Sequence, residues 1–291
     1  MEGLLPIDKP RGPTSFDVVR AVRRAANIRR VGHAGTLDPL AEGLLLICLG
    51  RATRLVELLM GGEKIYRARI ALGRQTETDD AQGETLAEAD VPPLGEKSVR
   101  AALARFTGEI EQVPPAYSAL KQEGVPQYRR ARRGERVEPR PRKVRIDAIE
   151  LERLGERELE LTVRCGRGTY IRSLARDLGI ALGTRAHLAA LRRTHGSGFD
   201  VEEALPLARL DEPGFDLGSR VVPLGEALRG RPRAVLGREE ARRVRDGQRI
   251  EPPGGLEETA QGPLVLLDDR GELVAVAEQR EGRLAPLKVF R

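Results

Sequence analysis

Asp38 is the residue of this 291-residue chain whose surroundings best suit it to chemistry. It lies in the sequence GHAGTLDPLAEG, residues 32–43, whose three glycines can adopt backbone angles closed to other residues and let a ligand come close. Pro39 fixes its own φ and restricts Asp38 to an extended conformation. In an ordinary turn an aspartate only accepts hydrogen bonds from nearby N–H groups. The rigid loop around Asp38 predicts instead a reactive carboxylate, which can act as a nucleophile when it is ionised and oriented.

The elements around this loop can be predicted from apolar spacing. Between residues 18 and 26 the apolar residues recur at helical spacing, which predicts a helix from a Thr14 or Ser15 cap to about Asn27. A second helix is expected over residues 52–60, closed by two glycines. Strict alternation predicts strands over residues 66–72 and 159–165. The Asp38 loop would then lie between short helices or beside a leucine-rich strand.

The strand over residues 159–165 leads directly into Gly166-Arg167-Gly168-Thr169, which predicts a turn with Thr169 as a helix cap. Tyr170 and Arg172 would then lie in the first turn of a helix, at a junction where side chains commonly face a pocket. A cation opposes the helix dipole at that end. An ordinary surface role therefore fits Arg172 poorly.

The charge of the chain favours a polyanionic partner. Lys and Arg number 50 against 44 Asp and Glu, for a net charge of +6, and only six of the basic residues are lysine. Guanidinium groups bind phosphate oxygens with two parallel hydrogen bonds. A basic enzyme without a polymer partner, or a biased genomic base composition, would give a similar excess.

Residues 121–145 concentrate this charge. They hold ten basic and three acidic residues, a net charge of +7 that exceeds that of the whole protein. Such a run can be a solvated face. Its Gly and Pro content and weak periodicity favour instead an RNA-binding insertion, a loop that closes on nucleic-acid phosphates. Lys121, Arg129 and Arg130 are the candidate phosphate ligands.

Other classes of site lack their signatures in the sequence. Cys48 and Cys165 lie far apart in apolar stretches, so we expect buried, reduced thiols and no metal site. No phosphate-binding loop, dinucleotide fingerprint, zinc-protease motif or serine nucleophile elbow is present, and no cofactor is expected. The chain has no apolar run of about 18 residues and no signal-peptide pattern at its start, which predicts a cytoplasmic protein without a membrane association.

The C-terminal part is expected to form a separate unit. Residues 211–230 lose apolar periodicity and gather Pro and Gly. A helix over residues 238–245 and strands near Val265, Val274 and Leu287 then predict a small β-rich domain. We therefore expect a catalytic domain over residues 1–228, with the basic insertion at about 121–145, and a small domain over residues 229–291.

Several motifs in this order resemble those of the TruB-type tRNA pseudouridine synthases, which modify uridine 55 in the T-loop of tRNA. Besides residues 32–43, the matching segments are Lys9-Pro10 with Gly12 and Ser15, residues 64–67, residues 76–80 with Gly83, residues 117–121, residues 168–172 and residues 191–193. They span most of the first 200 residues. The resemblance implies an α+β pseudouridine synthase fold, with a central mixed, largely antiparallel sheet and flanking helices, and a small PUA-like C-terminal domain that holds the tRNA acceptor stem.

The resemblance also implies roles for three catalytic residues. Asp38 matches the essential aspartate of the family, and Arg172 matches the arginine that pairs with it and would keep it ionised. Tyr170 matches a tyrosine placed near the base when the proton leaves C5, although a packing role for it is an alternative. Whether Asp38 attacks the base, attacks the sugar or abstracts a sugar proton is left open.

Further positions match residues that bind the substrate. A uridine inside a folded loop must be flipped out to react. Tyr66 matches the residue that stacks on the flipped base, Leu191 a wall of its pocket, and His33 a histidine that fills the space the base leaves. Core packing for Tyr66 and Leu191, and a backbone-bonded loop position for His33, are the alternatives. Lys9 and Lys121 belong to matched motifs and are assigned to substrate binding.

Two positions depart from the family pattern, and other functions compete. Glu42 and Leu46 stand where the family usually has Thr and Pro, and Glu42 would raise the proton affinity of Asp38 if the two carboxylates met. The leading hypothesis is a cofactor-free, monomeric synthase with accessory tRNA-folding activity and no obligatory protein partner. A non-catalytic RNA-binding protein, or a synthase acting on another RNA or in a guide-RNA complex, are the alternatives.

Overall fold

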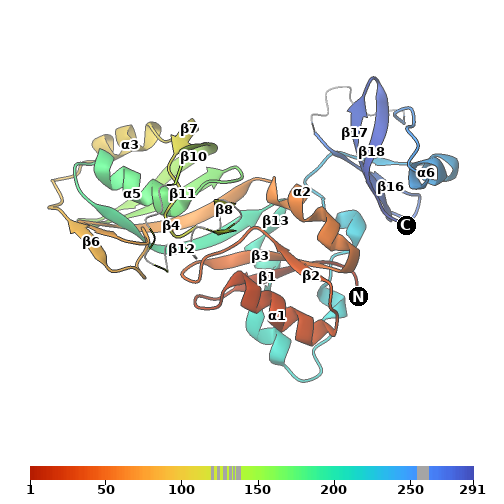
Figure 1. Cartoon of the computed structure of the whole chain (residues 1–291), viewed down its shortest axis with the longest axis horizontal. Coiled ribbons are helices and arrows are strands. Elements are labelled where there is room, and N and C mark those ends of the chain that lie inside the picture. Colours follow the sequence, from red (N-terminus) through yellow and green to blue (C-terminus); the bar gives the residue numbers. More distant parts are fainter. Residues whose placement is uncertain are drawn as a thin grey trace.

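The protein is built on one large mixed sheet with helices packed against it, followed by a smaller C-terminal sheet (Figure 1). The structure is a computed structural model, and it describes residues 1–118, 121–122, 125–126, 130, 133, 135, 139–253 and 262–291. None of the helices in these ranges is long and apolar enough to cross a membrane.

The large sheet has ten strands, and eight of them follow the order β14-β1-β3-β12-β4-β11-β10-β7, while β2 pairs with β3 and β13 with β12. Their bounds are β1 Gly3–Lys9, β2 Val31–Ala34, β3 Glu42–Leu49, β4 Lys64–Leu72, β7 Gly108–Gln112, β10 Arg142–Leu154, β11 Glu158–Cys165, β12 Ala186–Gly196, β13 Phe199–Asp200 and β14 Leu205–Pro206. Only the pairs β1·β14 and β3·β12 are parallel. The expected mixed, largely antiparallel sheet is confirmed.

The helices cover this sheet and connect its strands. They are α1 Ser15–Ala26, η1 Gly50–Leu55, α2 Val56–Met60, α3 Glu96–Ala104 and α5 Ile171–Ala181, with short 3-10 turns η2 Val201–Glu203, η3 Leu207–Asp211, η4 Gly218–Arg220 and η5 Leu224–Glu226. Two small ribbons, β5 Arg74–Thr76 with β6 Thr85–Glu88 and β8 Lys121–Gln122 with β9 Val125–Pro126, form separate two-stranded sheets.

Local sequence accounts for most of these elements. Thr14 caps α1 through a reciprocal capping box with Asp17, and Asn27 ends it in the left-handed conformation. The alternation in β4 buries Tyr66, Ala68 and Ile70 while Arg67 and Arg69 face outward. The predicted helix over residues 52–60 was only partly right, because its first turns form the 3-10 helix η1 and only the last five residues are α-helical.

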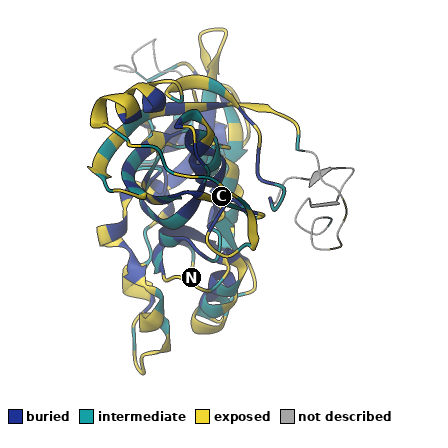
Figure 2. Ribbon diagram, turned by 90° about the vertical axis from the view of Figure 1, so that its left-hand side faces the viewer, coloured by how far each residue is buried: buried dark blue, intermediate teal, exposed yellow. Residues whose placement is uncertain are grey.

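The C-terminal sheet has the order β15-β16-β17-β18. Its elements are β15 Arg233–Val235, α6 Arg238–Arg245, β16 Leu264–Leu267, β17 Leu273–Arg280 and β18 Arg283–Val289. The helix agrees with the expected range, whereas β15 was not expected. One apolar cluster includes Val265 and Phe290 of this unit together with Leu44 and Leu55 of the first. Figure 2 shows buried residues in the interior of the ribbon and exposed residues on the outer helices and loops.

Candidate active site

The Asp38 loop joins β2 to β3 and is tied to the start of α1. The Ser15 hydroxyl donates to the Leu37 carbonyl at 3.0 Å and accepts from the Leu37 N–H at 2.8 Å. The Gly12 N–H donates to the Pro39 carbonyl at 2.8 Å. Bonds on both sides of Asp38 therefore hold its main chain, as the rigid setting in the sequence predicted.

The glycines at the ends of this loop are required by the backbone and by close packing. Gly35 and Gly43 have φ values of +91° and +97°, a region that favours glycine. A Cβ on Gly43 would stand 2.3 Å from the Arg193 carbonyl oxygen. β3 can thus approach β12 this closely only with glycine at position 43.

Arg172 faces Asp38 across the site. Its Nε lies 2.9 Å from Asp38 Oδ2, and 6% of the arginine side chain is exposed against 38% of the aspartate. The Nε–H is not aligned for a hydrogen bond, so the contact is an ion pair. The structure therefore brings together the two residues that the sequence analysis paired, although they are 134 positions apart.

Main-chain oxygens and a second carboxylate hold the Arg172 guanidinium. Nη1 donates to the Thr78 carbonyl at 2.9 Å and Nη2 to the Tyr117 carbonyl at 3.0 Å. Asp80 Oδ2 lies 3.8 Å from Nε, and the Asp80 carboxylate itself accepts from the Thr78 hydroxyl at 2.6 Å. The guanidinium is thus fixed on all sides before any substrate binds.

α5 begins one residue later than the sequence suggested. Its cap residue is Tyr170, not Thr169, and the side chain of Tyr170 makes no capping hydrogen bond. The Thr169 hydroxyl instead donates to the Gly166 carbonyl at 3.3 Å and closes the preceding turn. The turn geometry, which the residue types alone do not fix, decides where the helix starts.

Asp38 opens onto a cavity of about 390 Å³, within the size range of small-molecule sites. Its lining residues are Gly35, Thr36, Leu37, Asp38, Met60, Lys64, Tyr66, Arg142, Gly166, Arg167, Gly168, Thr169, Tyr170, Ile171, Arg172, Leu191 and Arg193. Asp38, Arg172, Tyr170, Tyr66 and Leu191 therefore share one cavity.

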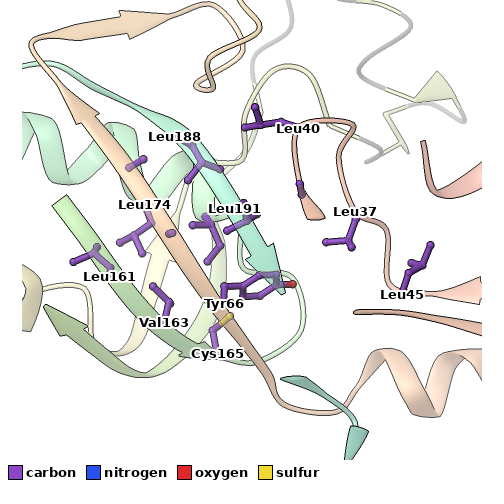
Figure 3. Close-up of a cluster of buried hydrophobic side chains, with 14 of the residues drawn as sticks. Leu37, Leu40, Leu45, Tyr66, Leu161, Val163, Cys165, Leu174, Leu188 and Leu191 are labelled. Atoms are coloured by element: carbon purple, nitrogen blue, oxygen red, sulfur yellow. The ribbon is translucent and has the colours of Figure 1, made fainter. Parts of the chain in front are cut away.

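Tyr66 and Leu191 belong to the apolar part of the wall, with Leu37, Met60 and Ile171. Tyr66 and Leu191 are also members of the main core cluster, with 8% of each residue exposed, and Figure 3 shows the Tyr66 ring with Leu191 and Leu37 in this cluster. Burial raises the pKa of the Tyr66 and Tyr170 phenols. Both phenols therefore stay protonated near neutral pH, which disfavours Tyr170 as a phenolate base.

The lining of the cavity is strongly cationic. Its charged members among the described residues are Lys64, Arg142, Arg167, Arg172 and Arg193 against Asp38 alone. Burial lowers the pKa of Lys64 from 10.5 to about 8, so its ammonium is still largely charged at neutral pH. A site with this balance favours an anionic ligand.

Lys9 differs from its assignment to substrate binding. Its side chain is completely buried, and Nζ donates to the Pro10 carbonyl at 2.9 Å. Burial lowers its pKa to about 8, while Asp38 and Glu42 oppose that shift. The ammonium is enclosed and does not line the cavity, so in this structure Lys9 supports the protein around Asp38.

His33 also lies outside the cavity lining, within β2. Its Nδ1 is buried without a hydrogen-bond partner, which differs from a backbone-bonded loop position, and burial lowers its pKa. Glu42 pairs with Arg192 at 3.7 Å, so its carboxylate is directed to that cation. Leu46 is buried in the core, as expected for a packing change.

The predicted ligands in the basic segment are mostly not tested. Arg129 and the side chain of Lys121 lie outside the described residues. Arg130 is described, and its Nε lies 2.7 Å from Glu135 Oε2. Both cysteines are buried, as expected. In the described ranges no three His, Cys, Asp or Glu side chains gather as they would around a metal ion.

Arg193 is a site residue to which sequence reasoning gave no role. It is 3% exposed, and it donates to the Leu44 carbonyl at 2.6 Å and to the Gly35 carbonyl at 3.1 Å. It thereby connects the two ends of the Asp38 loop, and its charge opposes the rise in the pKa of the Tyr66 phenol. Its presence in a matched Leu-Arg-Arg motif was the one available signal.

Comparison with known proteins decides the family. Residues 23–171 match the model described as TruB family pseudouridylate synthase (N terminal domain). Residues 172–228 match the tRNA pseudouridylate synthase B C-terminal domain. The chain belongs to the TruB family. It is accordingly a pseudouridine synthase, and the family resemblance read from its motifs is confirmed.

Relatives and solved structures agree with this assignment. The chain is 43% identical over 294 residues to tRNA pseudouridine synthase B of Xanthomonas campestris pv. campestris strain 8004, covering 100% of this chain and 94% of that protein. It is 45% identical over 300 residues to tRNA pseudouridine synthase B of Thermobifida fusca, covering 99% and 98%. A structure titled as a Cbf5-Nop10-Gar1 complex matches with a TM-score of 0.75 and 27% identity, over 99% of this chain and 85% of that one. The fold is therefore that of the pseudouridine synthases.

Proposed function

We propose that this TruB-family protein converts uridine 55 in the T-loop of tRNA to pseudouridine, with Asp38 as the catalytic residue. The observation that carries the proposal is the Asp38–Arg172 ion pair of 2.9 Å at the wall of the 390 Å³ cavity. The relatives named tRNA pseudouridine synthase B support tRNA as the substrate.

The reaction exchanges one bond for another within a single nucleotide. The bond from N1 of uracil to the sugar breaks, the base turns in its pocket, and C5 bonds to the same sugar carbon. The C5 proton leaves and N1 takes up a proton, so the product is an isomer of the substrate. A cavity of this kind suits a base that has been flipped out of the RNA. Tyr66 and Leu191 offer apolar surfaces for the face of the ring.

The charged residues have separable tasks in this scheme. Arg172 holds the Asp38 carboxylate by charge, and its own anchoring on two carbonyls keeps Asp38 directed into the cavity. Lys64, Arg142 and Arg167 line the same cavity and fit the phosphates on either side of the flipped nucleotide. Tyr170, a protonated phenol, contacts the base from the start of α5.

The decisive test replaces the carboxylate with its neutral isostere. We expect Asp38→Asn to abolish isomerisation, measured as release of tritium from C5 of labelled uridine in tRNA, while the Kd for tRNA stays unchanged. Asp211→Asn, at an exposed position far along the chain, is the matched control and should keep full activity. A fully active Asp38→Asn enzyme would refute the catalytic assignment, and mass-spectrometric mapping of the product would refute position 55 if pseudouridine formed elsewhere.

The same variant tests the accessory activity. We infer that tRNA folding by this protein does not depend on the chemistry, because the cationic side chains that would hold tRNA, such as Lys64, Arg142 and Arg167, are different groups from the Asp38 carboxylate, although they line the same cavity. Asp38→Asn should therefore still promote tRNA folding. We also propose that residues 229–291, which carry their own four-stranded sheet, form a PUA-like RNA-binding unit.

A further inference from the structure

The side chain of Gln112 is bonded to both polar groups of the Tyr170 main chain. Gln112 is the last residue of β7, and 2% of it is exposed. Its Nε2 donates to the Tyr170 carbonyl at 3.1 Å, and its Oε1 accepts from the Tyr170 N–H at 2.8 Å. The buried side-chain amide thus donates one hydrogen bond to the main chain of a residue 58 positions away and accepts one from it, as the main chain of a neighbouring strand would.

This pairing gives the Tyr170 N–H a partner that the local chain does not supply, whereas the Tyr170 carbonyl also accepts from the Leu174 N–H at 3.1 Å. Tyr170 is the cap residue of α5, with φ −106° and ψ 110°, and its side chain makes no capping bond. A free N–H at a buried helix start would cost about 1–3 kcal/mol. Gln112 satisfies that N–H and fixes the extended conformation from which α5 begins.

The conformation of Tyr170 determines where two site residues lie. Its phenol lines the cavity, and Arg172 follows two residues later. A change in φ at Tyr170 would swing the phenol and the first residues of α5 together, and a change in ψ would turn α5 relative to the phenol. Arg172 would then leave its position opposite Asp38.

Neighbouring residues hold other atoms of the same junction. The Val113 carbonyl accepts from the Ser173 hydroxyl at 2.8 Å and from Arg176 Nη2 at 2.9 Å. Neither bond touches the Tyr170 main chain. Within the described part of the chain, Gln112 is the side chain that sets this backbone.

We propose that Gln112 is a positioning residue for isomerisation, which acts by fixing the Tyr170 backbone and through it the placement of Tyr170 and Arg172 in the cavity. The inference rests on the proposed function of that cavity. It predicts a loss in the chemical step and not in tRNA binding, because Gln112 does not line the cavity.

The test uses Gln112→Ala and Gln112→Glu in the full-length protein, with kcat and the Kd for tRNA measured across pH. Both variants should lower kcat by about tenfold or more at pH 8, since misplacement by about 1 Å can cost about a hundredfold. The Kd for tRNA should change by no more than about twofold.

The glutamate variant provides a readout that lost stability alone would not give. Ionised glutamate can still accept from the Tyr170 N–H but repels the Tyr170 carbonyl, whereas protonated glutamate can donate to it. The ratio of its kcat to that of the wild type should therefore rise as the pH falls. Gln112→Ala should show no such rise. Arg142, the strand partner of Gln112, is present in both the variant and the wild type, so the ratio compares the two enzymes with the same neighbouring charge.

Ser173→Ala is the matched control, because it removes the adjacent bond to Val113 without touching the Tyr170 main chain. It should retain most of the wild-type kcat. Wild-type kcat in Gln112→Ala, an equal loss in Ser173→Ala, or a flat ratio in Gln112→Glu would each overturn the proposal. Gln112→Glu keeps the test decisive if Gln112→Ala does not fold. If the inference about Gln112 fails in one of these ways, Asp38→Asn should still be inactive and the proposed function stands. An active Asp38→Asn enzyme would instead refute the proposed function itself.

Discussion

The completely buried side chain of Lys9 should make stability depend on pH in a direction opposite to that of an ordinary ion-paired lysine. Burial lowers its pKa from 10.5 to about 8. At about 1.4 kcal/mol per pKa unit, the charged form costs the folded state about 3 kcal/mol. Below pH 8 both states are protonated and the cost is complete. Between pH 8 and 10.5 the folded protein releases the proton first, and the cost declines.

Lys9→Met removes the charge and keeps a similar shape. It also removes the bond to the Pro10 carbonyl, worth about 1.5–3 kcal/mol for a charged donor. The variant should therefore equal or exceed the wild type in stability at pH 7. The free energy of unfolding of the wild type should then rise relative to the variant by about 2 kcal/mol between pH 8 and 10.

Urea unfolding of both proteins at pH 7, 8.5 and 10 measures this difference. The contribution of Lys64 is common to both proteins and cancels. Lys143→Met, at an exposed position, is the matched control for replacing a lysine with methionine. The reasoning would be refuted if the difference in the free energy of unfolding between the wild type and Lys9→Met stayed constant with pH. It would also be refuted if Lys9→Met became more stable relative to the wild type as the pH rose.

Two further outcomes follow from packing. Gly43→Ala should destabilise the protein by at least about 2 kcal/mol, because its Cβ would stand 2.3 Å from the Arg193 carbonyl oxygen. Gly108→Ala is the control, because Gly108 has a similar φ but no atom within 4 Å of the added Cβ, and it should destabilise the protein less. Equal losses of stability in thermal unfolding would contradict this prediction. Burial raises the pKa of the Cys48 and Cys165 thiols to about 12 and about 11, so neither should react with a charged thiol reagent at pH 8 before urea unfolds the protein.

Elements with a local signal could be predicted from the sequence. The Thr14 cap, the period of α1, the alternation in β4 and β11, and the range of α6 all follow from residues close together in the chain. The 3-10 turns of η1 and the true start of α5 could not, because helix type and cap position depend on a balance of contacts between neighbouring segments.

The sequence by itself determined the family and the principal residues of the site. Motifs around Asp38, Tyr66 and Arg172 are contiguous strings, so their residue types and order are visible without a structure. Only the tertiary structure decided that Lys9 is enclosed, that Arg193 connects the ends of the Asp38 loop, and that Gln112 holds Tyr170. Each of these side chains bonds to main-chain atoms. Such bonds leave no periodic pattern, and those of Arg193 and Gln112 join segments 58 or more residues apart.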